Sequence, residues 1–263
     1  MDGAPTFDRV RFAAALSTRW LGRELIARHA VESTNDVVWD ALAAGAPDGV
    51  VAVADLQTRG RGREGRLWHT PAGLGLAMSM LLRPGCERHT RTVLPLAAGL
   101  ALARALEAAG ADGRLKWPND VLLGGRKVSG ILCESRRGPD GDDAIVVGIG
   151  VNVLQRGSDF PDDLRPIATS LAIEGVSTDR ETLAAGFLNG FEPLWTELDE
   201  AGPAGIIEAW RRRATFWGLT LTVRTPAGEV SGTARTLGED GSLELVGADG
   251  APMRIVAGDV AQP

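Results

Sequence analysis

The chain has 263 residues, which is enough for one large domain with or without a small one. Hydrophobic residues make up 44% of it and charged residues 24%, as is ordinary for a soluble globular protein. A formal net charge of −6 argues against a protein that follows a nucleic-acid backbone, although it allows a local basic site. Neither a secretory signal nor an apolar run of about 18 residues is present, so we expect a cytoplasmic protein without a membrane contact.

Cysteine and histidine are sparse in this sequence. The spacing of Cys86 and Cys133 matches no metal motif, and we interpret them as two free thiols in a reducing compartment. The histidines at positions 29, 69 and 89 are too scattered for a metal site or a catalytic triad. No metal site is therefore predicted from the protein's own side chains.

Helical and strand-like patterns alternate along the first four fifths of the chain. Ser33 or Thr34 is placed to cap the second helix, and Gly124-Gly125 predicts a two-residue primed turn between two strands. Apolar spacing predicts helices over 9–16, 35–44, 90–109, 178–198 and 204–213, and strands over 49–56, 75–82, 121–123, 126–133 and 143–150. This alternation predicts an α/β domain over residues 1–217.

The character of the sequence changes near Gly218. Period-two runs over 219–225, 230–237, 242–246 and 253–256 are separated by glycine-containing turns. We therefore expect a small all-β domain over residues 218–263, with a core so thin that it leans on the larger domain.

A segment rich in arginine and glycine, Gly60-Arg61-Gly62-Arg63-Glu64-Gly65-Arg66, follows the first strand. Glycines let backbone N–H groups approach a ligand closely, and arginines recognise phosphate and carboxylate in a bidentate manner. The segment therefore indicates a movable anion site, with a solvated loop or a nucleic-acid-binding segment as alternatives. Trp68, just beyond it, either stacks on a nucleobase or packs in the core.

Two further segments combine polar groups with close spacing. In Lys116-Trp117-Pro118-Asn119-Asp120, Asn119 could meet an adenine edge, or the segment could simply form a turn. In the strand over 126–133, alternation places Lys127, Ser129 and Ile131 on one face. Gly130 in mid-strand marks a close approach by a ligand or another backbone, while Lys127 is either an anion ligand or a surface residue.

The order of these segments is more specific than any one of them. Ser33-Thr34-Asn35, Gln57 with the arginine segment and Trp68, Lys116 to Asp120, Arg126 to Leu132, and Gly148-Ile149-Gly150-Val151-Asn152 together resemble the biotin protein ligase family. The resemblance implies a class II synthetase-like catalytic domain, with a mixed sheet flanked by helices, and a small SH3-like C-terminal domain. It also implies a two-step reaction. Biotin and ATP give biotinyl-5′-AMP and pyrophosphate, and a carrier-domain lysine then takes the biotin, with Mg²⁺ shielding the triphosphate.

The resemblance also implies a role for each matching residue. Lys127, Arg66 and Arg63 would be catalytic. The biotin-binding residues would be Ser33, Thr34, Asn35, Gln57, Gly60, Arg61, Trp68 and Gly130. The ATP- and adenylate-binding residues would be Arg61, Arg63, Arg66, Trp68, Lys116, Asn119, Asp120, Lys127 and Asn152.

Partners and alternatives follow from the same resemblance. We expect the partner to be the biotin carboxyl carrier domain of an acyl-CoA carboxylase, and the chain to be a monomer or a weak dimer. Some members carry an N-terminal winged helix-turn-helix, but about 30 residues precede Ser33, so we expect no DNA binding. The main alternative is a lipoate ligase or acyl transferase of the related fold, and a nucleic-acid-binding module is the second.

Overall fold

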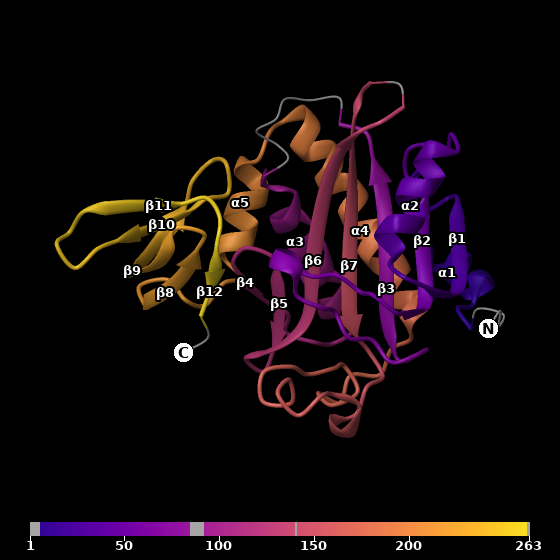
Figure 1. Cartoon of the computed structure of the whole chain (residues 1–263), viewed down its shortest axis with the longest axis horizontal. Helices are drawn as coiled ribbons and strands as arrows, with labels where there is room; N and C mark the ends of the chain where they lie inside the picture. The colour runs from indigo at the N-terminus through magenta and orange to yellow at the C-terminus, as the bar shows by residue number, and fades with distance from the viewer. Residues whose placement is uncertain (1–5, 85–91, 140, 262–263) are drawn as a thin grey trace.

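The structure is a computed structural model that describes residues 6–84, 92–139 and 141–261. Its larger sheet contains β1 (Leu25–Val31), β2 (Val51–Gln57), β3 (Gly75–Leu82), β4 (Arg114–Lys116), β5 (Asp120–Leu123), β6 (Arg126–Arg137) and β7 (Asp143–Asn152). Among the described residues these strands lie in the order β1-β2-β3-β7-β6-β5-β4 (Figure 1). The β1–β2 pair is parallel and the other pairs are antiparallel, so the predicted mixed sheet is confirmed.

Helices cover both faces of this sheet. They are α1 (Arg9–Ala15), α2 (Thr34–Ala43), α3 (Leu94–Ala108), α4 (Arg180–Glu200) and α5 (Ala204–Arg211). Alternate residues at the start of β2 separate the faces: Ala52 and the preceding Val50 pack with α2, while Val51 and Val53 join the main core under α3 and α4. The α2 face of the sheet therefore remains partly open, because one short helix covers less of it than α3 and α4 cover on the other face.

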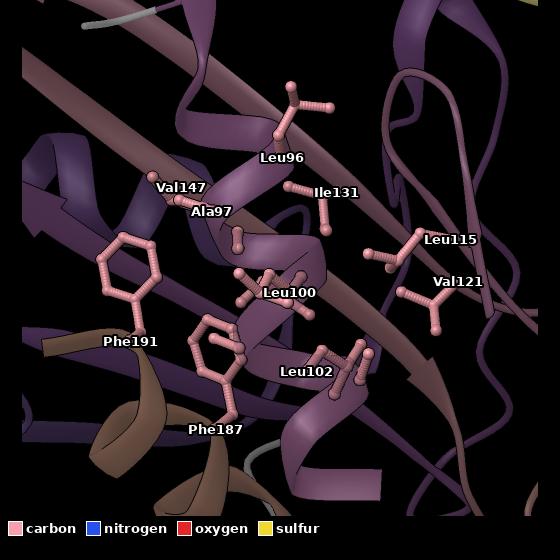
Figure 2. Packing of buried hydrophobic residues seen from close by; sticks show 14 of the residues in the cluster. Leu96, Ala97, Leu100, Leu102, Leu115, Val121, Ile131, Val147, Phe187 and Phe191 are labelled. Atoms are coloured by element: carbon pink, nitrogen blue, oxygen red, sulfur yellow. The ribbon is translucent and has the colours of Figure 1, made fainter. Parts of the chain in front are cut away.

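Helix α3 is the centre of the main core. Its Leu100 and neighbouring residues lie among Phe187 and Phe191 of α4 and Ile131 of β6 (Figure 2). Positions 90 and 91 of the predicted helix lie outside the described residues. The described helix has a proline at its second position and is followed by Gly110 at φ +86°, which is the usual chemistry of a helix start and end.

Most of the predicted strands are confirmed, but two strands, β1 and β4, were not predicted. Strand β3 has its predicted bounds, and the Gly124-Gly125 turn has both residues at positive φ, as a primed turn requires. Strand β1 was not predicted, because its edge position leaves its side chains half-buried without a clean apolar alternation. Strand β4 was also missed, since three residues show no period.

The C-terminal region forms the second sheet, which is antiparallel. Its strands are β8 (Thr220–Thr225), β9 (Gly228–Leu237), β10 (Leu243–Val246), β11 (Pro252–Ile255) and β12 (Asp259–Val260), in the order β11-β10-β9-β8-β12. Trp117 of the larger unit donates from its indole N–H to the carbonyl oxygen of Gly241 at 2.9 Å, and Gly241 also lies against Leu96 of α3. The small sheet therefore leans on the larger domain, as predicted.

Two further features concern the cysteines and the membrane. Burial raises the pKa of the Cys133 thiol to about 12, so this free cysteine stays protonated at neutral pH, whereas Cys86 lies outside the described residues. Within the three described ranges, no helix has the length and apolarity needed to cross a bilayer.

Candidate active site

A cavity of about 410 Å³ opens on the α2 face of the larger sheet. Its wall comes from five parts of the chain. They are the start of α2, residues 57–69, the segment from the turn before β5 into β6, the end of β7 together with residues 160–168, and the second sheet. The residues predicted as site residues that line it are Ser33, Thr34, Asn35, Gln57, Arg61, Arg63, Arg66, Trp68, Lys116, Asn119, Asp120, Lys127, Gly130 and Asn152. The fold thus brings together predicted site residues that are up to 119 positions apart in the sequence, from Ser33 to Asn152.

One end of the cavity is a hydrogen-bonded polar group at the start of α2. The backbone N–H of Thr34 donates to Gln57 Oε1 at 2.8 Å, and the Ser79 hydroxyl lies 2.7 Å from Thr34 Oγ1 and 2.6 Å from Asn35 Oδ1. The Asn35 amide nitrogen is buried and has no hydrogen-bond partner among the described residues. Because an unsatisfied buried donor costs about 1–3 kcal/mol, this amide is suited to an acceptor on a bound molecule.

The predicted helix cap differs from the structure. Ser33 has the backbone conformation of an N-cap, but its side chain makes no capping hydrogen bond to a described residue. Thr34 is already helical, and its hydroxyl donates to Gln57 at 3.0 Å instead. The Ser33-Thr34-Asn35 segment therefore presents its polar groups to the cavity and to Gln57 rather than to the helix end.

Three glycines form the floor of the cavity. A Cβ atom on Gly148 would lie 2.3 Å from Asn35 Oδ1, and one on Gly150 would lie 2.3 Å from the Trp68 ring. A Cβ on Gly130 would lie 3.3 Å from both Lys127 Nζ and Trp68. The close approach predicted at Gly130 is therefore present, but it is made by side chains of the protein itself and not by a ligand or another backbone. Gly148 and Gly150 are approached by side chains in the same way.

Lys127 lies on the cavity side of β6, on the same side as Gly130. The prediction that it shares a face with Ser129 and Ile131 is wrong. The β5–β6 register shifts at Val121/Leu122, so that Val121 pairs with Ser129 while Leu122 pairs with Lys127. One extra residue in β6 interrupts the alternation and turns Lys127 towards the cavity, whereas Ile131 packs in the main core. A single sequence carries no periodic signal for such a bulge.

Cations gather at the other end of the cavity. Lys127 Nζ lies 2.6 Å from Asp120 Oδ1 and 5.9 Å from the Trp68 ring centre, and Lys116 Nζ lies 3.9 Å from Asp120 Oδ2. Burial lowers the pKa of Lys116, while the Asp120 carboxylate opposes that shift. This end of the cavity therefore has two lysines around one carboxylate, which favours an anionic ligand group.

Residues 60–68, here called the arginine loop, form a small hairpin over the cavity. The backbone N–H of Gly62 donates to Arg66 O at 2.7 Å, and that of Trp68 donates to Gly60 O at 2.8 Å. Glu64 at its tip has φ +58°, a left-handed conformation that costs a non-glycine residue energy. Arg59, outside the hairpin, forms an exposed pair with Glu32 and is therefore a solvated flank of the hairpin.

The three predicted ligand arginines all contact protein groups in this structure. Arg61 pairs with Asp36 and Glu134, Arg63 donates to Asn119 Oδ1 and Gly258 O, and Arg66 pairs with Asp259 at 2.7 Å. The amides of Asn119 and Asn152 donate to Ile131 O and Thr169 O, at 2.7 and 2.9 Å. Direct contact of these five side chains with substrate stays a prediction.

Two parts of the cavity wall were missed by sequence reasoning. One is an irregular segment that supplies Phe160, Leu164, Ile167 and Ala168, and the other is the second sheet, which supplies Arg224, Asp259, Val260 and Ala261. The first segment also holds the backbone of Lys127, since the Lys127 N–H donates to Ile167 O at 2.8 Å and the Thr169 N–H donates to Lys127 O at 2.9 Å. Neither part has a local motif, so no sequence signal could have identified it.

The carboxylate of Asp259 lies among the cations of the cavity. Burial alone would raise the pKa of Asp259, but the hydrogen bond from Arg66 and the charges of Lys116, Arg66 and Lys127 hold it below its usual range. The carboxylate is therefore ionised at neutral pH and links the second sheet to the arginine loop.

Comparison with known proteins gives concordant matches. Residues 27–152 match the model of the Biotin/lipoate A/B protein ligase family. The bifunctional ligase/repressor BirA of Bacillus subtilis is 37% identical over 238 residues, which cover 90% of this chain and 73% of that protein. The chain belongs to the biotin protein ligase family. The biotin–[acetyl-CoA-carboxylase] ligase of Paracoccus denitrificans is 37% identical over 215 residues, which cover 80% of this chain and 89% of that protein.

A solved structure of this family has the same fold. The biotin protein ligase from Aquifex aeolicus, in complex with biotin and ATP, superposes with a TM-score of 0.79 at 29% identity. The match covers 91% of this chain and 98% of that one, so it includes both sheets. Membership of the biotin protein ligase family favours the biotin interpretation over the lipoate ligase, acyl transferase and nucleic-acid alternatives.

Proposed function

We propose that the chain is an ATP-dependent ligase that activates biotin as biotinyl-5′-AMP and transfers it to a lysine of a biotin carboxyl carrier domain. The observation that carries the proposal is the composition of the cavity on the α2 face of the larger sheet. It joins a neutral polar end, with the unsatisfied Asn35 amide, to an end with two lysines. Such a cavity suits a molecule with a polar neutral ring at one end and a carboxylate at the other, beside a nucleotide.

In the first step, a biotin carboxylate oxygen attacks the α-phosphorus of ATP. The bond from that phosphorus to the bridging oxygen breaks, and pyrophosphate leaves with the electron pair. Two anions must meet, so positioning and positive charge supply most of the catalysis. In the second step the carrier lysine's amine attacks the acyl carbon, AMP leaves, and the amine loses a proton to water.

The proposed division of labour follows the two ends of the cavity. Ser33, Thr34, Asn35 and Gln57 bind the biotin ring, because they supply neutral donors and acceptors beside one another. Lys127 neutralises the reacting carboxylate and phosphate oxygens, with Arg66 and Arg63 beside it. Trp68, Lys116, Asn119, Asp120 and Asn152 hold the adenylate, directly or by fixing the backbone around it.

Mg²⁺ would enter with the triphosphate. The nearby carboxylates of Asp120 and Asp259 already face cations, at 2.6 Å from Lys127 and 2.7 Å from Arg66. Mg²⁺ keeps several waters and prefers phosphate oxygens, so we expect ATP and water to supply most of its ligands. Bound there, the ion would neutralise phosphate charge and orient the leaving group.

The remaining assignments extend the same proposal. The domain boundary lies at 217/218, immediately before the second sheet, which begins at Thr220. The partner is a biotin carboxyl carrier domain, and the Paracoccus relative, a biotin–[acetyl-CoA-carboxylase] ligase, supports this assignment. The reaction takes place in the cytoplasm, where ATP and that carboxylase would be found.

The direct test is release of pyrophosphate by the purified chain with MgATP. We expect release that depends on biotin and stops after about one turnover without a carrier domain, because the adenylate stays bound. Lipoate and octanoate serve as matched controls for the alternative substrates. Release with lipoate but not with biotin would contradict the proposal in favour of a lipoate ligase.

A further inference from the structure

The contacts of Arg61 suggest a function that differs from the one its motif implies. Its guanidinium donates to both oxygens of Asp36, at 2.7 and 2.8 Å, and to Glu134 Oε1 at 3.2 Å. The Asp36 hydrogen bonds, together with the charges of Glu134 and Asp36, raise the pKa of Arg61 against the effect of burial. A bidentate pair with a second carboxylate beside it occupies most of the directional donors of this side chain.

The charge around Arg61 is also unlike that of an anion site. Two carboxylates surround this one guanidinium, and the next cation, Arg136, lies 3.8 Å from Glu134. At neutral pH these four groups sum to about zero. The attraction for phosphate therefore lies at the lysine end of the cavity and not at Arg61.

Both carboxylates are held in place by the fold. Asp36 lies in the first turn of α2, where a negative charge is favoured by the helix dipole. Glu134 Oε2 accepts the indole N–H of Trp39 at 2.8 Å, which leaves Oε1 for Arg61. The Arg136 guanidinium stacks on that indole, 4.6 Å from the ring centre. Arg61 thus binds a preformed pair of carboxylates, one from α2 and one from β6.

The hairpin pairing connects Arg61, held by Asp36 and Glu134, to the rest of the arginine loop. Arg61 is bridged to Leu67 across the hairpin, and Leu67 directly precedes Trp68 on the glycine floor. On the other strand of the hairpin, Arg66 pairs with Asp259 of the second sheet. Both strands of the hairpin are therefore tied to other parts of the protein, Arg61 to α2 and β6 and Arg66 to the second sheet.

We propose that Asp36 and Glu134 are positioning residues for the ligase reaction. They bind Arg61, and through it they hold the arginine loop, with Arg63, Arg66 and Trp68, closed over the cavity. The kinetic test of this proposal rests on the proposed function. A second test measures the protection of the arginine loop from protease and needs no activity.

The kinetic test compares Asp36→Asn and Glu134→Gln with Glu32→Gln. Glu32 is the matched control, because it pairs with Arg59 of the same segment at 3.3 Å but is exposed. We expect kcat/KM for ATP to fall about tenfold in each test variant, since a charge-assisted hydrogen bond is lost at a half-buried site, and to stay unchanged in the control. In an Arg61→Gln background, Asp36→Asn should not lower kcat/KM for ATP further, because both substitutions remove the same Asp36–Arg61 contact.

The sign of the effect distinguishes positioning from ligand binding. If Arg61 bound phosphate directly, removing its competing carboxylate would tighten ATP binding, so a lower KM for ATP in Asp36→Asn would overturn the proposal. Arg61→Lys should not restore activity, because an ammonium cannot make the bidentate pair.

Limited trypsin digestion gives the readout that needs no catalysis. We expect cleavage after Arg63 and Arg66 to be several times faster in Asp36→Asn and Glu134→Gln than in wild type or Glu32→Gln, at unchanged melting temperature. Equal cleavage rates in all four proteins would overturn the positioning role even if the chain proved to have another substrate. An inactive wild type with the expected digestion pattern would instead contradict the proposed function alone.

Discussion

Lys127→Ala is expected to slow formation of the adenylate by about 10²–10³-fold, the usual cost of removing one preorganised charge from a transition state. Lys127 Nζ lies at the lysine end of the cavity, over the Trp68 ring and beside Asp120. No other described lysine than Lys116 lines the cavity, and Lys116 is 3.9 Å from Asp120 on its other oxygen. Single-turnover formation of biotinyl-5′-AMP measures this effect without interference from product release.

The matched control for this substitution is Arg137→Ala. Arg137 is a cation on the same strand, β6, but it is exposed at the far end and does not line the cavity. Asp120 keeps Lys116 as a partner in Lys127→Ala, so we expect the variant to fold with a somewhat lower melting temperature. Adenylate formation at a near-normal rate in a folded Lys127→Ala protein would remove Lys127 from the mechanism.

Gly150→Ala is expected to lower kcat/KM by about 10²-fold, because it displaces Trp68 from the floor of the cavity. The added methyl group would lie 2.3 Å from Cε2 and Nε1 of the Trp68 ring, far inside van der Waals contact. Overpacking of this kind costs about 1–3 kcal/mol unless the neighbour moves, and Trp68 lies on a loop that can move. The measurement is steady-state kinetics together with thermal melting.

Two further variants show whether Trp68 is the cause. Gly157→Ala adds the same methyl group where, apart from the adjoining residues, no described atom lies within 4 Å, and should behave as wild type. Combining Gly150→Ala with Trp68→Ala should be no worse than Trp68→Ala alone, since the clash is gone. A Gly150→Ala protein with unchanged kinetics would show that the position of Trp68 does not matter.

The elements that could be predicted from the sequence are those with a local residue pattern. Strand β3 is a continuous apolar run, the Gly124-Gly125 turn has its own chemistry, and α3 repeats its apolar residues at helical spacing. The site motifs were also recognisable as an ordered series, and all but Gly60 among the residues predicted from them line one cavity. Gly60 does not line the cavity, and a Cβ there would meet Trp68 O at 2.4 Å.

What could not be predicted depends on pairing between distant segments. The bulge that turns Lys127 towards the cavity exists only in the β5–β6 register, and Asp259 reaches Arg66 across 193 positions of sequence. Likewise, Arg61 meets Asp36 and Glu134 only because α2 and β6 lie on either side of it. An arginine in a glycine-rich segment looks the same in sequence whether it binds a phosphate or a carboxylate of its own chain.

The most direct test of the central claim is mass spectrometry of a biotin carboxyl carrier domain after incubation with the chain, biotin and MgATP. The account predicts one biotinyl group in amide linkage on a single lysine, with AMP released in equal amount. A carrier domain that stays unmodified, or one that is modified only when lipoate replaces biotin, would contradict it.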